Sequence, residues 1–488
     1  MNRQTDSLTP IAEDRRRADR RGALVVLMCF AAVFAEGYDL VIYGSVVPAL
    51  LDYDEWGLDA PAVGTIASLA LAGMLVGASI SGLLTDTFGR RKVLIGCVAF
   101  FSLTMAACAV APSPEIFGLF RFLGGLALGG VVPAAITLGV EYAPKGRGNF
   151  YNGLVNSGYG IGGVVSALLA LWFIADHGFR LMFWIGALPL VTLVPIAMRY
   201  LPESIDFLNS KGRYVEARAT AEKYGRAWSL DNAQAAEESR RTRASNPLSA
   251  LFGRRYLMVT LLFIGAYFIG LLLSYGLNTW LPQIMREAGY PLGSALTSLV
   301  VMSAGGVFGV LTLSRIADRF GARNVAMCAF GVAVLSLVVL SLSPATAIFY
   351  IALFAAGVGS WGTTVVISGY VTQVMPTDLR GSMLGIGMGL GRFGAVLGPQ
   401  VGGWVLASGL AIEWNFYVFI IPAAVGPLIL FVMPLALAAS RRRVGGEDVA
   451  GGAPATGDFD AEPLTNAARA DANPPESSGT GGGNLAGR

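Results

Sequence analysis

Four ionisable side chains interrupt stretches of this sequence that are otherwise apolar: Glu36, Asp39, Arg121 and Arg392. If those stretches cross a membrane, the charges are costly there and are expected to face an internal pathway. Arg392 would lie roughly 17 Å from the inner face, close to the bilayer centre. Its permanent, planar cation matches the geometry of a carboxylate, so Arg392 is the first candidate for binding an anionic substrate and Arg121 the second.

Glu36 and Asp39 are spaced i, i+3 and therefore share one face of a helix, about 20 Å from its inner end. Two carboxylates on one dry face cannot both ionise easily, so one is expected to take up and release a proton. The alternative is that the pair only neutralises Arg121 or Arg392. Glu141, at the inner end of a later helix, is a second proton-coupling candidate or an inner-gate partner of loop arginines.

An aromatic ligand would also need a slot between helices. The candidates are Tyr38, Tyr275, Asn278 and Trp361, followed by Trp280, Tyr370 and Phe393. Tyr275 and Asn278 are favoured because they lie i, i+3 in mid-helix. Trp280, next to Pro282, is more typical of a membrane-interface anchor.

Composition indicates what positions these side chains. Of 488 residues, 54% are hydrophobic and 14% charged, and the mean hydropathy is +0.60. A soluble protein carries about a quarter charged residues, so this chain is predicted to be an all-α membrane protein. Twelve apolar runs are predicted to span the bilayer: 23–49, 62–83, 93–111, 116–140, 151–174, 181–200, 256–281, 292–316, 325–342, 345–374, 382–407 and 414–435.

The runs divide the chain into five regions. These are an N-terminal tail (1–22), a first six-helix bundle (23–200), an inter-bundle loop (201–255), a second six-helix bundle (256–438) and a disordered tail (439–488). Nearly all Lys and Arg residues fall in alternate loops, with only Arg180 and Arg286 in the others. Because cations concentrate in cytoplasmic loops, both termini are predicted to be cytoplasmic, in the cell's inner or plasma membrane.

Several classes of function are disfavoured. The net charge of +3 is spread by the topology, so no nucleic-acid partner is expected. The first apolar run contains Glu36 and Asp39 and does not resemble a signal peptide. The single histidine, His177, and the absence of a Cys-x-x-Cys spacing argue against a metal site. No phosphate-binding loop motif occurs, so a primary pump is not expected and energy would come from an ion gradient. Neither enzymatic activity nor a cofactor is expected of a transporter of this kind.

An internal repeat relates the two predicted bundles. Asp86 corresponds to Asp318 at an offset of 232 residues, and Pro144 corresponds to Pro376 at the same offset. Two parallel six-helix halves of this kind are expected to place a substrate site between them near the midplane.

The segment GLLTDTFGRRK (82–92) resembles the signature between helices two and three of the major facilitator superfamily. RFLGGLALGG (121–130) and LPESIDFL (201–208) resemble further motifs of that superfamily. The resemblance implies a gating role for the following residues: Gly82, Asp86, Gly89, Arg90 and Arg91, with Asp318 and Arg319 in the second copy. Alternatively the cations only stop the helix at the membrane's inner side.

Three segments resemble the aromatic acid:proton symporter family more particularly: EGYDLVIYG (36–44), YGLNTWLP (275–282) and GRFGAVLGP (391–399). The resemblance implies uptake of benzoate-like or hydroxybenzoate-like carboxylates. The family's first helix usually carries Asp-Gly-x-Asp, and here Glu36 replaces the first acid, which keeps the charge but adds one methylene of reach.

These observations predict a symporter that imports a small aromatic carboxylate with protons by alternating access and works as a monomer. A sugar, polyol or other organic-anion porter of the same fold is the alternative, although a neutral substrate gives no reason for Arg392. A drug antiporter is disfavoured because 158–163 lacks a Gly-Pro step. A non-transporting membrane sensor of the same fold also stays open.

Overall fold

The apolar runs become long helices in the computed structural model, which describes residues 8–144, 147–231, 234, 247–342 and 345–450. Residues Met1–Arg441 form one unit and Arg442–Arg488 a second. Both predicted six-helix halves lie in the first unit, and all the site residues discussed below belong to it.

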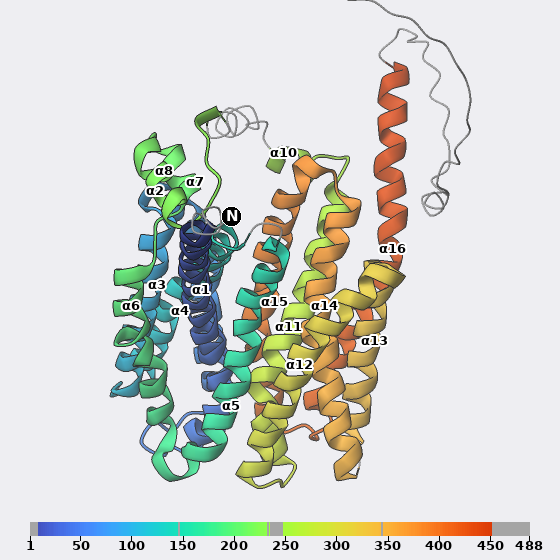
Figure 1. Cartoon of the computed structure of the whole chain (residues 1–488). Coiled ribbons are helices and arrows are strands. Elements are labelled where there is room, and N and C mark those ends of the chain that lie inside the picture. Colours follow the sequence, from blue (N-terminus) through green and yellow to red (C-terminus); the bar gives the residue numbers. More distant parts are fainter. Residues whose placement is uncertain (1–7, 145–146, 232–233, 235–246, 343–344, 451–488) are drawn as a thin grey trace, which may run out of the picture. The chain divides into compact units, whose positions relative to one another are not determined.

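The N-terminal half is drawn in blue to green in Figure 1. Its elements are α1 (Leu8–Leu51), α2 (Ala60–Phe88), α3 (Arg90–Ala109), α4 (Pro114–Glu141), α5 (Gly148–Ala187), the short 3-10 helix η1 (Leu188–Leu190) and α6 (Leu193–Tyr200). The single helix α1 begins inside the predicted N-terminal tail and runs through the first predicted span without a break.

The C-terminal half, drawn in yellow-green to red, follows a loop that carries three short helices. The loop helices are α7 (Ile205–Ser210), α8 (Tyr214–Lys223) and α10 (Pro247–Phe252), and the long helices are α11 (Leu257–Glu287), α12 (Leu292–Phe320), α13 (Ala322–Ser341), α14 (Thr346–Val374), α15 (Thr377–Ala407) and α16 (Trp414–Ala450). Within the predicted inter-bundle loop, α8 buries Ala217 and Ala221 one turn apart.

Ten helical segments of the described residues are long and apolar enough to cross a membrane. One of them, Phe150–Tyr200, contains two of the predicted spans. The non-helical backbone of Gly178 breaks α5 and separates these two spans. The remaining predicted span is α15, whose many glycines lower its hydropathy. With these two taken into account, the predicted all-α fold is confirmed, and the chain is an integral, multi-pass membrane protein.

The repeat is visible in the backbone. Gly89 joins α2 to α3 with φ +94°, and Gly321 joins α12 to α13 with φ +84°, at the predicted offset of 232 residues. Only glycine adopts this region without strain. Gly57 and Gly289, also at positive φ, have the same spacing. The two halves therefore share their turns as well as their helices.

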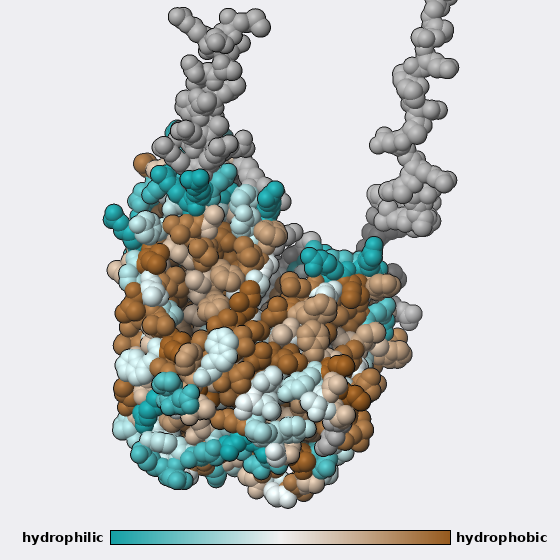
Figure 2. Space-filling model, turned by 60° about the horizontal axis from the view of Figure 1, so that its bottom comes forward, coloured by the Kyte–Doolittle hydropathy of each residue, from teal (hydrophilic) through white to brown (hydrophobic). Residues whose placement is uncertain are grey.

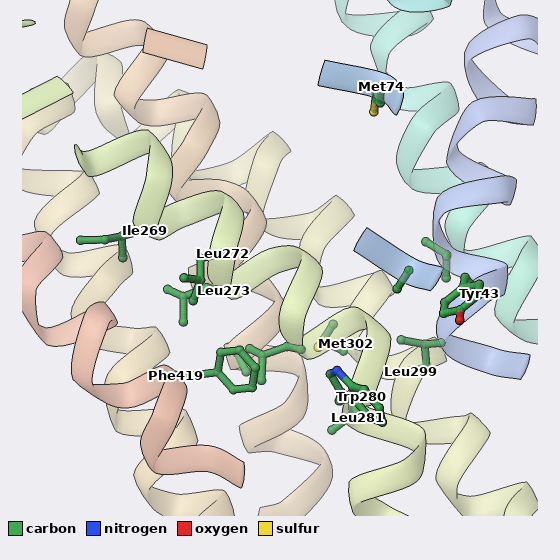
Figure 3. Packing of buried hydrophobic residues seen from close by; sticks show 14 of the residues in the cluster. Tyr43, Met74, Ile269, Leu272, Leu273, Trp280, Leu281, Leu299, Met302 and Phe419 are labelled. Atoms are coloured by element: carbon green, nitrogen blue, oxygen red, sulfur yellow. The ribbon is translucent and has the colours of Figure 1, made fainter. Parts of the chain in front are cut away.

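Apolar side chains fill the interior between these helices and also cover the surface that would face lipid. A large buried apolar cluster includes residues of both halves, and Figure 3 shows Trp280 and Leu281 of α11 beside Leu299 of α12 within it. Large apolar side chains are also exposed, such as Leu83 at 72%. Figure 2 shows apolar surface over the sides of the helices and hydrophilic residues toward their ends, as expected for contact with lipid.

Contacts between the two halves gather toward the end predicted to face outward. The Thr65 hydroxyl of α2 donates to the side-chain oxygen of Gln400 of α15 at 3.0 Å. The Ser68 hydroxyl donates to the carbonyl of Val396 at 2.6 Å. Arg286, near the end of α11, pairs with Asp52 after α1 at 2.5 Å. These contacts hold α2 against α15 and α1 beside α11.

Candidate functional site

The two acids of α1 have different surroundings although both are 1% exposed. Asp39 accepts a hydrogen bond from the guanidinium of Arg121 of α4, and the two form a buried ion pair. Arg121 also lies over the rings of Tyr43 and Phe183, at 5.4 and 5.9 Å. A cation and an anion that satisfy each other in this way neutralise one another inside the N-terminal half.

Glu36 has no such partner. Neither of its carboxylate oxygens has a hydrogen-bond partner among the described residues, and both are buried. The charges that act on it are the cation of Arg392 on α15 and the like charge of Asp39. An ionised carboxylate in this position lacks both water and hydrogen bonds, which is costly unless a proton or a cation neutralises it.

Arg392 brings the C-terminal half to Glu36. Its neighbours Gly391 and Gly394 lie against Tyr267 and Phe268 of α11, so closely that an added Cβ would overlap them. Small residues at such a crossing allow two membrane helices to approach. One terminal nitrogen of Arg392, Nη1, is buried and has no hydrogen-bond partner among the described residues. Arg392 is thus fixed in place by helix packing and has an N–H donor that is free to bind a ligand.

Three aromatic rings lie beside this pair of charges. The hydroxyls of Tyr159 on α5 and Tyr275 on α11 are 3.0 Å apart. Trp361 of α14 contacts both rings, with centroid distances of 5.4 Å to Tyr159 and 5.5 Å to Tyr275. Both tyrosine hydroxyls interact electrostatically with Glu36 and Arg392. We call Glu36, Tyr159, Tyr275, Trp361 and Arg392 the central cluster.

The other two predicted ligands differ in their placement. Asn278 is 3% exposed, and neither atom of its amide has a hydrogen-bond partner among the described residues. It lies one turn from Tyr275 on the same face of α11. Tyr38, two residues from Glu36, donates to the carbonyl of Met182 at 2.8 Å and therefore packs within the N-terminal half. Asn278 thus shares a helix face with Tyr275 of the central cluster, whereas Tyr38 packs within the N-terminal half.

Glu141 lies at the other end of α4, away from the α1 acids. Its carboxylate pairs with Arg90 at 3.4 Å and accepts from the backbone N–H of Asp206 at 2.9 Å. Arg90 also donates to the hydroxyl of Ser204 at 2.6 Å. Glu141 therefore joins the signature segment to the loop after α6, and its role at an inner gate stays a prediction.

The remaining residues of the predicted gating motif divide into two groups. Gly89 and Arg91 contact Glu203: the backbone N–H of Arg91 donates to its carboxylate at 2.9 Å, and an added Cβ on Gly89 would overlap it. Gly82 has open space around it, so the structure shows no close backbone approach there. The other members, Asp86, Asp318 and Arg319, are exposed.

Tyr159 is the member of the central cluster that the sequence analysis did not single out. The glycines around it pack α5 on α1, since an added Cβ on Gly158 would lie 2.7 Å from the carbonyl oxygen of Phe30. The internal repeat could have indicated Tyr159. Arg147 corresponds to Arg380 when one residue is inserted after Pro376, and with the same insertion Tyr159 corresponds to Arg392; both follow a glycine.

Comparisons with known proteins identify the family of the chain. The profile of the Major Facilitator Superfamily matches residues 29–399 and 297–463. The chain is 35% identical to the benzoate transport protein of Acinetobacter baylyi over 84% of this chain and 89% of that protein. It is 36% identical to the gentisate transporter of Corynebacterium glutamicum over 85% of this chain and 88% of that protein.

Among solved structures, the chain is similar to the xylose transporter of E. coli in a partially occluded, inward-open conformation. The TM-score is 0.66 at 16% identity, over 83% of this chain and 98% of that one. At this identity the likeness concerns the fold alone. Fold, internal repeat and sequence relatives agree: the chain belongs to the major facilitator superfamily, in the branch that contains these aromatic acid transporters.

Proposed function

We propose that this protein is a symporter that imports a small aromatic carboxylate together with protons. The observation that carries the proposal is the central cluster: a buried acid and a half-buried cation, Glu36 and Arg392, come from opposite halves and have unused hydrogen-bonding atoms beside three aromatic rings. The benzoate and gentisate transporters to which the chain is similar support an aromatic acid as the substrate.

The charges of Glu36, Arg392 and the substrate carboxylate give the reason for proton coupling. Without substrate, the cation of Arg392 faces the carboxylate of Glu36. A substrate carboxylate that binds Arg392 adds a second anion, so that two anions share one cation. In a site with little water this excess charge is unfavourable, and a proton on Glu36 removes it. Substrate binding and protonation of Glu36 would therefore favour each other.

Transport requires that the loaded site open first to one side of the membrane and then to the other. With the carboxylate on Arg392 and the proton on Glu36, the central cluster is neutral, and the two halves can rock around it at little electrostatic cost. The outward contacts of Thr65 with Gln400 and of Arg286 with Asp52 would have to open during this motion. The pair of Asp39 and Arg121 stays satisfied within one half and would move with it.

The setting of the protein is part of the proposal. The distribution of cations along the sequence supports both termini on the cytoplasmic side of the cell's inner membrane. Both halves and every residue of the central cluster belong to one chain, which supports function as a monomer. We further propose that the transporter is driven by the proton gradient and uses no cofactor.

Uptake into proteoliposomes tests the proposal. Labelled benzoate, 4-hydroxybenzoate and a hexose are offered after an acid jump outside the vesicles. We expect uptake of the carboxylates, stimulated by the inward proton gradient, and its loss in Arg392→Ala. Arg315→Ala, which removes an exposed arginine of α12, is the matched control and should transport normally.

Each other result has a definite meaning. Uptake of the hexose but not the carboxylates would support a sugar porter, for which Arg392 has no role. Carboxylate binding without uptake would indicate a sensor. Carboxylate uptake that Arg392→Ala leaves unchanged would disprove the anion-binding role of Arg392.

A further inference from the structure

Benzoate alone would leave polar groups of the site without partners. Its carboxylate can satisfy Arg392, and a proton can neutralise Glu36. Asn278 then still holds an amide with two donors and an acceptor, buried and without a hydrogen-bond partner among the described residues. A buried polar group left unpaired costs about 1–3 kcal/mol, so the amide points to a ligand that satisfies it.

The tyrosine pair also has a hydrogen-bond donor without an acceptor. Two hydroxyls 3.0 Å apart share one hydrogen, which leaves the other O–H without an acceptor in that pair. Tyr275 and Asn278 are separated by three residues of α11, or about 4.5 Å along the helix axis, and share a face. The tyrosine pair and the unpaired amide of Asn278 are therefore presented on one face of the helix that also meets α1 at Gly44.

The chemistry that fits this group is a phenolic hydroxyl. A phenolic hydroxyl donates one hydrogen bond and can accept others, so it can bond to a tyrosine O–H and to an amide at the same time. Trp361 contacts both tyrosine rings and supplies a flat wall against which an aromatic ring can lie. Arg392 lies close enough to interact electrostatically with Tyr275, so one small molecule could reach both with its carboxylate and its hydroxyl.

We propose that Tyr159, Tyr275 and Asn278 bind a ring hydroxyl of the substrate, and that the protein therefore prefers a hydroxylated aromatic carboxylate over benzoate. This inference rests on the proposed function and names the feature of the substrate that the site distinguishes. A site that hydrogen-bonds a substrate hydroxyl rejects the analogue that lacks it, because its own polar groups are then left unpaired.

A purely structural role predicts a different outcome. Tyr159 and Tyr275 come from opposite halves, so their hydrogen bond could serve only to hold α5 beside α11. Asn278 could likewise be a tolerated packing residue. In that case substitutions would change the transport of every substrate by the same factor, and the ratio between substrates would not move.

The experiment measures that ratio. Proteoliposomes carrying the full-length protein take up labelled benzoate, and 2-, 3- and 4-hydroxybenzoate are assayed both as labelled substrates and as competitors. The variants are Tyr275→Phe, Tyr159→Phe and Asn278→Leu. The matched control is Tyr267→Phe, a buried tyrosine of the same helix α11 whose hydroxyl donates to Ser368 at 2.8 Å within the C-terminal half.

We expect at least one hydroxybenzoate isomer to be preferred over benzoate by the unsubstituted protein, by about tenfold or more. Tyr275→Phe and Asn278→Leu should lower the ratio of hydroxybenzoate to benzoate uptake about tenfold, and Tyr267→Phe should leave that ratio unchanged. Any benzoate uptake that remains also reports that the variant is folded. If one variant is inactive toward all substrates, the preference in the other two decides.

Two failures are distinguishable. If the protein transports aromatic carboxylates without preferring any hydroxylated isomer, or if the variants leave the preference unchanged, this inference is wrong and the proposed function stands. If no aromatic carboxylate is transported by the unsubstituted protein, the proposed function itself fails, and the inference fails with it.

Discussion

At the scale of single residues, the site separates two acids that look alike in the sequence. Asp39 is paired with Arg121, whereas Glu36 has no hydrogen-bond partner among the described residues and faces Arg392. The same residue type therefore serves two purposes on one helix. The paired acid neutralises a buried cation, and the unpaired acid is available for a proton.

Arg392→Lys tests the geometry of the anion site. Lysine keeps the charge but loses the planar fork that binds both carboxylate oxygens. We expect the KM for an aromatic carboxylate to rise about tenfold, with a smaller change in the maximal rate. Uptake kinetics in proteoliposomes measure both parameters. A KM equal to that of the unsubstituted protein would show that the fork is not used.

The pair of Asp39 and Arg121 predicts an effect on stability. Asp39→Asn leaves a buried cation unpaired, which should cost about 3–5 kcal/mol, whereas the double variant Asp39→Leu/Arg121→Met removes both charges and should cost less. Thermal unfolding of detergent-purified protein compares them. If the double variant were the less stable of the two, the buried pair would contribute net stability, contrary to this account.

At the scale of elements, glycine determines how closely the helices approach around the site. Gly37 of α1 packs on the backbone of Tyr159, and Gly391 and Gly394 let α15 approach α11. These contacts place Glu36, Tyr159 and Arg392 on helices that are held close together. The positions of the charges therefore depend on residues that have no side chain.

Gly37→Ala should displace the residues of the site although it changes none of the side chains proposed to bind substrate or protons. The new methyl group would overlap the carbonyl of Tyr159, so α1 and α5 must move apart. We expect a lower melting temperature and at least a tenfold loss of uptake. Gly153→Ala on α5, where a methyl group has open space, is the control and should change neither. Normal uptake by Gly37→Ala would mean that this contact is not needed.

The contact between α2 and α15 predicts a conformational lock. Thr65 and Gln400 are joined by a hydrogen bond of 3.0 Å between the two halves. In a protein whose four native cysteines are replaced by serine, Thr65→Cys and Gln400→Cys should be joined by a short, reducible thiol cross-linker, which should stop uptake. Reduction should restore it. The single-cysteine variants are the controls, and undiminished uptake by the cross-linked protein would contradict rocking of the halves.

The sequence predicted the elements better than the contacts between them. Long apolar runs made the twelve spans predictable, and the repeat of Asp86 and Asp318 indicated two related halves. The early start of α1 was not apparent from hydropathy, because a helix can continue into water, whereas the break at Gly178 falls between the predicted spans 151–174 and 181–200. Nor could the sequence show which cation each acid faces, since that depends on how α4 and α15 pack.

At the scale of the whole molecule, the site exists only because two halves of one chain meet. Glu36 and Tyr159 come from the first half, and Tyr275, Trp361 and Arg392 come from the second. A motion of one half against the other changes the surroundings of all five residues together. Charge neutralisation at the centre and opening at the ends are in this account two aspects of one transition.

Proton movement during uptake tests this central claim most directly. An aromatic carboxylate is added to lightly buffered proteoliposomes with no initial gradient, and the external pH is recorded for the unsubstituted protein and for Glu36→Gln, which imitates the protonated acid. We predict external alkalinisation with substrate entry for the unsubstituted protein. For Glu36→Gln we predict substrate exchange across the membrane without proton movement. Proton uptake by Glu36→Gln equal to that of the unsubstituted protein would contradict the account.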